Sequence, residues 1–349
     1  MTGHESSPSR FGRYARQIAF PGIGEVGQGA LSAARVTIIG VGATGSVLAN
    51  HLARSGVGRL RLVDRDFVEL SNLQRQLLFD EDDVAALLPK SVAAAAKLRR
   101  INSDIRIEEV VTEVNQANIR SLVADADVIL DGTDNFSTRY LINDISVQLG
   151  KPWIYCGVVA AYGMTMTIRP GFTPCLRCVM GELPAPGTTP TCETAGIVGP
   201  IVTLIGSVAA TEAIKLIVGQ GVPNRGMVYV DLWEGSYDHF ELGGRSPSCP
   251  ACGTREFPAL QPNVGPSATA LCGRDAVQVS FGEGKPVDLV AVADQFRAAG
   301  VRDVRQNDFL VRANLEGHEL TLFGDGRAII KGTNDEVRAM SLYSRFVGM

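Results

Sequence analysis

Apolar runs alternate with helical patterns along the first part of the chain. Residues 35–41 form a β-branched run that ends in glycines, and residues 59–63 form a second run that ends in Asp64. Short runs of this kind are typical of buried parallel strands. A helical pattern follows at 46–54, and an Ala-rich one at 89–101.

The alternation continues further along the sequence. Strands are predicted at 105–111 and 127–130, with a short helix at 115–123 between them and another helix at 138–149. Strands and helices that alternate at these lengths predict a parallel sheet with right-handed crossovers. We therefore expect an α/β fold with a Rossmann-like, mostly parallel sheet.

The pattern changes after Lys151. Strands at 153–159, 162–169 and 227–233 predict an antiparallel extension of the sheet. Beyond a linker containing Pro and Ser, a compact alternation predicts a small C-terminal α+β domain, with elements at 276–280, 289–299, 308–313, 318–323, 327–331 and 335–346. The expected division is an N-terminal arm, a main domain, a linker and this small domain, at 1–22, 23–257, 258–267 and 268–349.

Composition and charge favour a soluble globular protein over a nucleic-acid-binding or membrane protein. The chain has 349 residues, of which 45% are hydrophobic and 20% charged, and its net charge is −4. These values are ordinary for a soluble globular protein and give no sign of a nucleic-acid or membrane surface. The most apolar stretch, 197–219, contains Pro200, Glu212 and Lys215, which favours a buried helix over a membrane span. We expect a soluble, cytoplasmic protein.

A glycine-rich turn lies between the first predicted strand and its helix. Gly40, Gly42 and Gly45 have the spacing G-x-G-x-x-G, and Asp64 ends the second strand. Glycines allow a phosphate to approach the backbone at a helix N-terminus, and an acidic residue at that strand end can hold a ribose hydroxyl. Alone, this arrangement predicts a nucleotide and favours NAD.

Cations and carboxylates elsewhere favour ATP instead. The polar loop 66–76 and Lys90 supply basic groups that suit a triphosphate. Residues 131–135 close the fourth strand at the edge where ligands bind in open α/β sheets. Carboxylates beside phosphates commonly hold Mg²⁺. Each feature taken singly also fits a solvated loop charge, and Asp134 also fits a helix cap.

Four of the seven cysteines form two C-x-x-C pairs, Cys175 with Cys178 and Cys249 with Cys252. Four thiolates suit tetrahedral zinc in a structural site, whereas either pair alone would fit a redox dithiol. The two matched pairs favour zinc.

With these motifs in this order, residues 13–253 resemble the ThiF/MoeB/HesA family of ubiquitin-activating-enzyme-like adenylyltransferases. The runs that carry the resemblance are RYARQ, GVGATG, SNLQRQ, PK and DGTDN, together with the cysteine pairs.

The family resemblance implies roles for individual residues. Those expected to bind ATP are Gly40, Gly42, Gly45, Asp64, Asn72, Arg75 and Lys90. Asp134 would hold Mg²⁺. Arg16, which would otherwise be taken for a surface salt-bridge residue, would reach into the partner subunit's site, so a homodimer is implied. The four paired cysteines would bind structural zinc.

Cys192 lies at the end of a segment rich in Gly, Pro and Thr. A thiol in an exposed loop can be activated, and the resemblance implies a thioester or acyl-persulfide step there. The alternative is an idle loop cysteine. Cys156 and Cys272 are expected to be structural.

The predicted reaction is ATP-dependent adenylation of the C-terminal glycine carboxylate of a small β-grasp carrier, ubiquitin-like or sulfur-carrying, that ends in Gly-Gly. Transfer to sulfur would follow, on Cys192 or a delivered persulfide, and a sulfur donor or conjugating enzyme would be a further partner. Three alternatives stay open: a nicotinamide-dependent oxidoreductase, a catalytically quiet scaffold for a ubiquitin-like protein, and a relative that activates a tRNA carboxylate. The pathway and the role of the C-terminal domain stay open as well.

Overall fold

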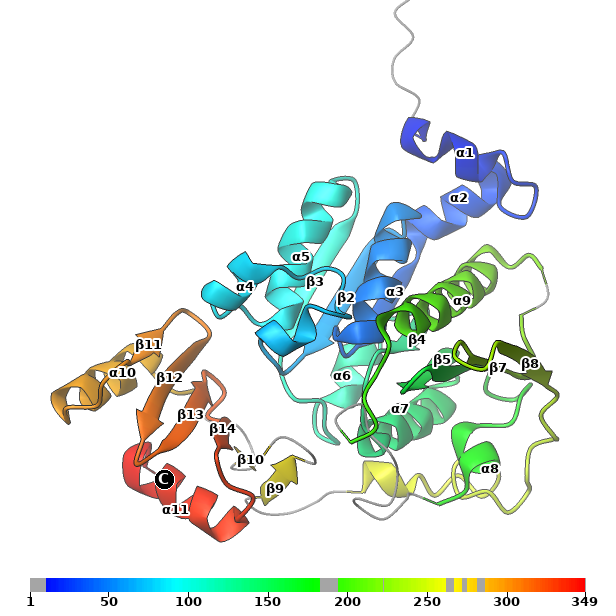
Figure 1. The fold of residues 1–349 in the computed structure, drawn as a ribbon. Helices are drawn as coiled ribbons and strands as arrows, with labels where there is room; N and C mark the ends of the chain where they lie inside the picture. The colour runs from blue at the N-terminus through cyan, green and yellow to red at the C-terminus, as the bar shows by residue number, and fades with distance from the viewer. Residues whose placement is uncertain are drawn as a thin grey trace, which may run out of the picture. The chain divides into compact units, whose positions relative to one another are not determined.

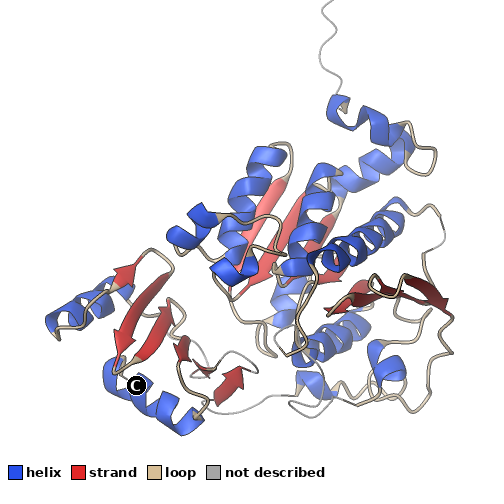
Figure 2. Cartoon of the chain, in the orientation of Figure 1, coloured by secondary structure: helices blue, strands red, loops and turns tan. Residues whose placement is uncertain are grey.

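The fold was analysed in a computed structural model of the chain (Figure 1). The structure describes residues 11–182, 194–221, 223–261, 267–271, 275–280 and 286–348. These residues form two compact units, the first of which ends at Gln261. Figure 2 shows that both units mix helices with strands.

The first unit is built on an eight-stranded sheet in the order β3-β2-β1-β4-β5-β6-β7-β8. The pairings from β3 to β5 are parallel, and those from β5 to β8 are antiparallel. The strands are β1 (Arg35–Ile39), β2 (Arg59–Asp64), β3 (Arg106–Val111), β4 (Val128–Asp131), β5 (Trp153–Val159), β6 (Tyr162–Ile168), β7 (Met227–Asp231) and β8 (Ser236–Phe240). The expected Rossmann-like sheet with an antiparallel extension is confirmed.

Helices cover both faces of this sheet, and each face has its own hydrophobic core. On one face α2 (Gly24–Ala33), α3 (Ala43–Arg54), α5 (Lys90–Ile101) and α9 (Gly199–Val218) pack over strand residues such as Ile38 and Leu60. On the other face α6 (Ile119–Val123), α7 (Phe136–Leu149) and α8 (Leu176–Met180) pack over residues such as Ile39 and Val63. The short α1 (Ala15–Ile18) and α4 (Glu81–Ala85) complete the described α-helices of this unit.

Among the described residues, α9 is the one helix long and apolar enough to cross a membrane, with a mean hydropathy of 1.9. It nevertheless packs against α3, α2 and β6. Its Glu212 is buried, where it accepts a hydrogen bond from the backbone N–H of Asn224 at 2.7 Å and pairs with Lys215 at 2.5 Å. A satisfied buried carboxylate and these packing contacts fit the expected core helix.

The second unit contains a six-stranded sheet in the order β11-β12-β13-β14-β10-β9, with every pairing antiparallel. Its strands are β9 (Ser267–Leu271), β10 (Ala276–Ser280), β11 (Arg305–Gln306), β12 (Leu310–Leu315), β13 (His318–Phe323) and β14 (Ala328–Lys331). Helices α10 (Leu289–Ala298) and α11 (Glu336–Phe346) contribute Phe296 and Leu342 to one core with the sheet. Asp288 and Asp335 cap these helices by accepting hydrogen bonds from backbone N–H groups.

Several elements differ from the sequence expectation. The first strand ends at Ile39 rather than at 41, because the glycine turn begins there. Helix α5 begins at Lys90, one residue after the expected start at 89, and Pro89 is its N-cap. Strand β8 was not predicted, because its residues are polar or exposed on both faces and show no alternation. Strand β9 begins at Ser267, the last residue of the expected linker.

Candidate nucleotide and metal sites

The glycine turn packs backbone against backbone at the carboxyl edge of the parallel strands. Gly40 has φ +83°, and a Cβ added there would lie 2.7 Å from the carbonyl O of Gly132. A Cβ on Gly45 would lie 2.0 Å from the carbonyl O of Gly40. Side chains at these two positions are therefore excluded. Gly42 precedes the first residue of α3, so its surroundings contain the free N–H groups of a helix N-terminus.

Asp64 is held at the end of β2 by two backbone donors. Its carboxylate accepts hydrogen bonds from the N–H of Val41 at 2.6 Å and of Asp66 at 2.8 Å. Burial raises the pKa of Asp64, and the nearby Lys90 acts in the opposite direction. The Asp64 carboxylate thus contacts the glycine turn. The family resemblance implies that it binds the ribose of a nucleotide there.

Lys90 is brought to the same edge by the start of α5. Its backbone N–H donates to the carbonyl of Asp66 at 2.9 Å, and its Nζ lies 3.2 Å from the Asp66 carboxylate. Lys90 is only 5% exposed, so its charge lies largely buried at this edge of the sheet. Arg65, next to Asp66, pairs with Glu113 at 2.6 Å.

The polar loop after β2 folds into a short 3₁₀ turn, Leu70–Asn72. Asn72 is buried, and its side-chain carbonyl accepts a hydrogen bond from the N–H of Glu69 at 3.2 Å. Arg75 is partly exposed and donates to the carbonyl of Ser71 at 2.9 Å. The loop thus orders Asn72, and among the described residues it engages one donor of the Arg75 guanidinium.

Gln76 was not predicted as a site residue, although it is the last residue of the SNLQRQ run. It is 4% exposed, and its Oε1 has no hydrogen-bond partner among the described residues. Its Nε2 would lie 3.6 Å from a Cβ added to Gly42, so the amide faces the glycine turn. A buried acceptor without a partner is costly, which suits a group that a ligand completes.

The loop after β4 is fixed by a buried ion pair that sequence reasoning also missed. Asp131 is fully buried, and its carboxylate accepts from Arg139 Nε at 3.1 Å and from Thr133 N and Oγ1 at 2.9 and 2.6 Å. Arg139 also donates to the carbonyls of Thr133 and Cys156, at 2.7 and 2.8 Å. Burial raises the pKa of Asp131 against the opposing charge of Arg139. Only a three-dimensional view reveals that residue 139 lies behind residue 131.

Asp134 is exposed at the tip of this loop. The helix cap that Asp134 was thought able to provide comes instead from Asn135, whose side chain accepts from the N–H of Thr138 at 2.8 Å. Asp134 acts electrostatically on Arg65 and Arg139. The carboxylate therefore stands at the nucleotide edge, and the N-cap of α7 is Asn135 rather than Asp134.

The four paired cysteines meet in a single cluster. The Sγ atoms of Cys175 and Cys249 are 3.6 Å apart, those of Cys178 and Cys252 are 3.3 Å apart, and all four lie within 4.8 Å of one another. Four thiolates at 2.3 Å from a tetrahedral zinc ion would be separated by about 3.8 Å. The arrangement therefore fits zinc, and it joins the two pairs in one site rather than forming two separate dithiols.

Two predicted residues are not brought to these sites within the described chain. Arg16 lies on the exposed side of α1, which Gln17 ties to the first unit through its 2.7 Å hydrogen bond to Gln28. Cys192 lies outside the described residues, as does Cys272. Cys156 is buried in β5, where burial raises the pKa of its thiol, as expected of a structural cysteine.

Comparisons with known proteins agree with this geometry. Residues 14–251 match the ThiF family. A sulfur carrier protein ThiS adenylyltransferase of Bacillus subtilis is 43% identical over 338 residues, which cover 97% of this chain and 99% of the relative. A SAMP-activating enzyme E1 of Haloferax volcanii is 39% identical over 242 residues, or 69% of this chain and 88% of the relative. The chain belongs to the ThiF family.

A solved structure supports the ThiF fold independently. The crystal structure of Escherichia coli MccB with ATP matches with a TM-score of 0.61 and 26% identity, covering 69% of this chain and 74% of the MccB chain. The ThiF family match ends at residue 251 and so leaves out residues 262–349, whereas the match to the Bacillus relative extends over nearly the whole chain. With relatives named as adenylyltransferases, the nicotinamide-dependent alternative is not favoured.

Proposed function

We propose that this ThiF family protein is an adenylyltransferase that uses ATP to activate the C-terminal glycine carboxylate of a small β-grasp carrier, either a sulfur carrier or a ubiquitin-like protein. The observation that carries the proposal is the carboxyl edge of the sheet. There, a glycine turn closed to side chains lies over Asp64 and beside the buried cation Lys90. Two relatives support the proposal by their names, a sulfur carrier protein ThiS adenylyltransferase and a SAMP-activating enzyme E1.

In this proposal the nucleotide lies along that edge. Asp64 receives the ribose, and the backbone of Gly40, Gly42 and Gly45 receives the phosphates. Donors for the triphosphate come from Asn72, Arg75 and Lys90, and we add Gln76 to this set. Asp134 would hold Mg²⁺, which when bound would neutralise charge on the phosphate oxygens. The buried Asp131–Arg139 pair supports the proposal by fixing the loop that presents Asp134.

The chemistry requires little from acids and bases. A C-terminal carboxylate is already ionised at neutral pH and can attack the α-phosphate directly, breaking its bond to pyrophosphate. The protein must align the two reactants and stabilise the charge on the departing pyrophosphate. Arg75 and Lys90 are the cations of this chain placed for that task, with Arg16 supplied by a partner subunit.

The carrier would dock on the aromatic face of the antiparallel extension, which is formed by Tyr162, Tyr229 and Phe240. The ring centroids of Tyr162 and Tyr229 are 5.9 Å apart, and those of Tyr229 and Phe240 are 6.3 Å apart. This face is partly open, since Phe240 is 48% exposed. The opposite face of β6 is covered by α9, whose Ile205 packs against Gly163. Because β6 begins at the nucleotide edge, a protein docked here can direct its tail to that edge. Replacing Tyr229 with Ala should raise the KM for the carrier and leave that for ATP unchanged.

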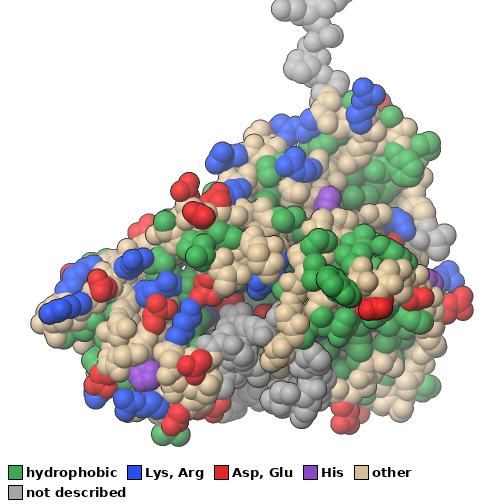
Figure 3. Space-filling view, viewed as in Figure 1, with side chains coloured by type: hydrophobic (Ala, Val, Ile, Leu, Met, Phe, Trp, Pro, Cys, Tyr) green, Lys and Arg blue, Asp and Glu red, His purple; other side chains and the backbone are tan. Residues whose placement is uncertain are grey.

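A homodimer would cover the apolar surface near the N-terminal arm. Phe20 and Val26 are 62% and 82% exposed, and the outward side of α9 is apolar and half-exposed. Figure 3 shows hydrophobic side chains gathered around α9 and α2 on the visible face of the first unit. Such patches mark interaction sites. Sedimentation of the wild type and of Phe20→Asp tests this, because a dimer predicts a smaller species for the variant.

Zinc in the four-cysteine cluster would be structural, because all four coordination positions are taken by thiolates. The acyl group of the adenylate formed at the nucleotide edge would then be transferred to sulfur, either the Cys192 thiol or a persulfide delivered by a sulfur donor, and AMP would leave. We place these steps in the main domain, 23–257, of a cytoplasmic protein. The division of the chain into arm, main domain, linker and C-terminal domain belongs to the same proposal.

The decisive experiment is ATP–pyrophosphate exchange by the purified chain in the presence of each small Gly-Gly-tailed protein of its source organism. We expect one carrier to support exchange in the wild type. Asp134→Ala should abolish the exchange, and Cys192→Ala should leave it intact because that thiol acts only after adenylation.

The possible outcomes separate the alternatives. ATP binding without exchange for any carrier would favour a scaffold or an RNA substrate. An absence of ATP binding would overturn the proposal. Loss of exchange in Cys192→Ala would move that residue into the adenylation step.

A further inference from the structure

Asn102, the residue that follows helix α5, ties the N-terminal arm to the body of the first unit. Its side chain is buried, and its Nδ2 donates hydrogen bonds to the Tyr14 hydroxyl at 2.8 Å and to the carbonyl of Ala53 at 2.6 Å. Its Oδ1 accepts from the Arg13 guanidinium and from the N–H of Asp104 at 3.1 Å. Both N–H groups and both lone pairs of this amide are therefore used, the full capacity of an asparagine side chain.

A second buried amide, that of Gln28 on α2, holds the other end of the arm. The Gln17 Nε2 donates to Gln28 Oε1 at 2.7 Å and to the carbonyl of Ser55 at 3.0 Å, and Gln28 donates to the same carbonyl at 3.1 Å. The Tyr14 ring packs against Gly56, where an added Cβ would lie 2.5 Å from the ring. The arm is thus fastened at two points to the ends of α3 and α5.

Arg16 lies between these two anchors and is not itself anchored. It is exposed and has no hydrogen-bond or ion-pair partner among the described residues. Three other residues of the same RYARQ run, Arg13, Tyr14 and Gln17, are bonded to the protein. An exposed cation on a backbone that is fixed on both sides is pre-organised for a partner, because little of the backbone has to be ordered when it binds.

The anchors lie at the end of the sheet that is opposite to the nucleotide edge. Helices α3 and α5 begin beside Gly42 and Lys90 at that edge, and each has 12 residues. They are therefore about 18 Å long, and the arm is fastened at their far ends. In Figure 1, α1 lies at the top of the view, beyond both helices. Arg16 cannot span this distance to the nucleotide edge of its own chain, so a site that uses Arg16 belongs to a second copy.

We propose that Asn102 is a positioning residue for the adenylation carried out by a second copy of this chain. It fixes the arm in the one orientation that presents Arg16 outward, while the nucleotide edge of its own chain does not depend on it. The assignment rests on the proposed function and its homodimer for the role of Arg16. The fastening of the arm by Asn102 can be tested without either.

The test uses mixed dimers, obtained by co-expressing two chains with different affinity tags and purifying the dimers that carry both tags. One chain carries Arg16→Ala and supplies a nucleotide edge. The other carries Asp134→Ala and supplies an arm. One of the two sites in such a dimer is complete, so ATP–pyrophosphate exchange with the carrier should reach about half of the wild-type rate, although each variant alone is impaired.

Asn102→Ala is then added either to the chain that supplies the arm or to the chain that supplies the nucleotide edge. The two mixed dimers contain the same three substitutions, so a general loss of stability affects both. Exchange should fall at least about tenfold when the arm chain carries Asn102→Ala, part of the roughly hundredfold effect of losing one charge-stabilising donor. It should stay within about twofold when the other chain carries it.

The matched control is Asn143→Ala. Asn143 is also a buried asparagine of the first unit, and its side chain accepts from the N–H of Leu176 at 2.8 Å, but it has no contact with the arm. Whatever effect Asn143→Ala has on exchange should be the same in the two arrangements.

Hydrogen exchange of backbone amides tests the anchor itself in the full-length protein. The N–H groups of Tyr14, Ala19 and Phe20 form hydrogen bonds within the arm. In Asn102→Ala they should exchange at least about tenfold faster than in the wild type, because the arm opens more often. In Asn143→Ala they should exchange at the wild-type rate.

Equal losses in the two arrangements of Asn102→Ala would overturn the positioning role, and so would arm amides that exchange at the wild-type rate in this variant. Mixed dimers of Arg16→Ala and Asp134→Ala that recover no activity would overturn it as well. If the wild type shows no exchange with any carrier, the proposed function fails, and the amide exchange rates still decide whether Asn102 holds the arm.

Discussion

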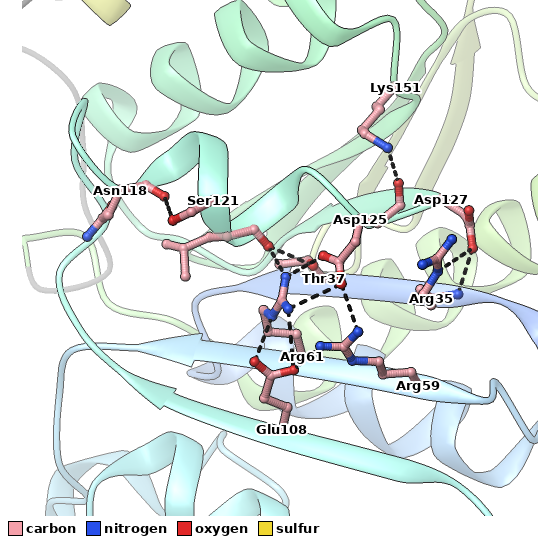
Figure 4. A network of polar contacts seen from close by, with 12 residues as sticks. Arg35, Thr37, Arg59, Arg61, Glu108, Asn118, Ser121, Asp125, Asp127 and Lys151 are labelled. Atoms are coloured by element: carbon pink, nitrogen blue, oxygen red, sulfur yellow. Dashed lines mark hydrogen bonds and ion pairs between the residues drawn. The ribbon is translucent and has the colours of Figure 1, made fainter.

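Two clusters of charged residues occupy opposite ends of the parallel sheet, and they use the same residue types differently. At the amino end, Arg61 donates to Asp125 at 2.6 Å, to Glu108 at 3.1 Å and to the carbonyl of Leu122 at 2.6 Å (Figure 4). At the carboxyl end, Arg75 makes one side-chain hydrogen bond among the described residues, to the carbonyl of Ser71. The first arginine is only 11% exposed in its side chain.

The difference separates charges that serve the fold from charges that serve a ligand. At the amino end, carboxylates on β3 and before β4 form ion pairs with both arginines of β2, Arg59 and Arg61. At the carboxyl end, Gln76 and Arg75 keep hydrogen-bonding capacity that the described residues do not fill. Identical substitutions in the two clusters should therefore have opposite effects on activity and on stability.

The largest effect is expected at Arg75. Arg75→Met keeps the aliphatic stem but removes the guanidinium, so the exchange rate should fall at least roughly hundredfold, the usual loss for one charge-stabilising donor. The free energy of unfolding should change by no more than about 0.5 kcal/mol, because the side chain is partly exposed and lightly bonded. Exchange assays and urea denaturation measure the two quantities. Destabilisation without loss of exchange would place Arg75 among the structural charges.

The reciprocal change, Arg61→Met, should act on stability alone. It removes one of the two arginines that pair with Glu108 and Asp125, the other being Arg59. The free energy of unfolding should fall by about 2 kcal/mol, less than for a fully buried pair because both acids are partly exposed. The exchange rate per folded molecule should stay within about twofold of the wild type. An exchange defect that persists where the variant is fully folded would break the comparison.

The amino-end cluster should also make the protein sensitive to acid. Burial raises the pKa of Glu108 and of Asp125, but hydrogen bonds from Arg61 and its neighbour Arg59 outweigh burial and leave both pKa values lowered. An acid whose pKa is lower in the folded protein stabilises it above the unfolded value, about 4, and that stability is lost as pH falls through the folded value.

Between pH 7 and pH 3 the wild type should therefore lose more stability than Arg61→Met. The difference should be less than about 1 kcal/mol, since solvent screens both acids. Denaturant titrations at several pH values measure it. Parallel pH profiles for the two proteins would show that the cluster does not set the acid response.

The contrast between the clusters also explains how far the sequence could predict this molecule. The parallel strands, the glycine turn and Asp64 follow from local patterns, because strand ends and glycine spacing are written along the chain. The partners of Arg61 and of Asp131 cannot be predicted from local patterns, because these partners come from other strands and helices. Strand β8 lacked alternation, and the role of Gln76 depends on an unfilled hydrogen bond that only the folded chain reveals.

The smallest effect is expected at Gln76, which tests whether a buried group without a partner serves a ligand or the fold. Gln76→Leu removes a buried acceptor that has no partner among the described residues, so the free energy of unfolding should stay equal or rise slightly. The KM for ATP should rise about threefold, because one donor or acceptor toward the nucleotide is lost. Gln76→Glu should raise this KM further, since a carboxylate beside the glycine turn repels phosphates. An unchanged KM with lower stability would instead make Gln76 an ordinary core residue and would remove it from the nucleotide edge.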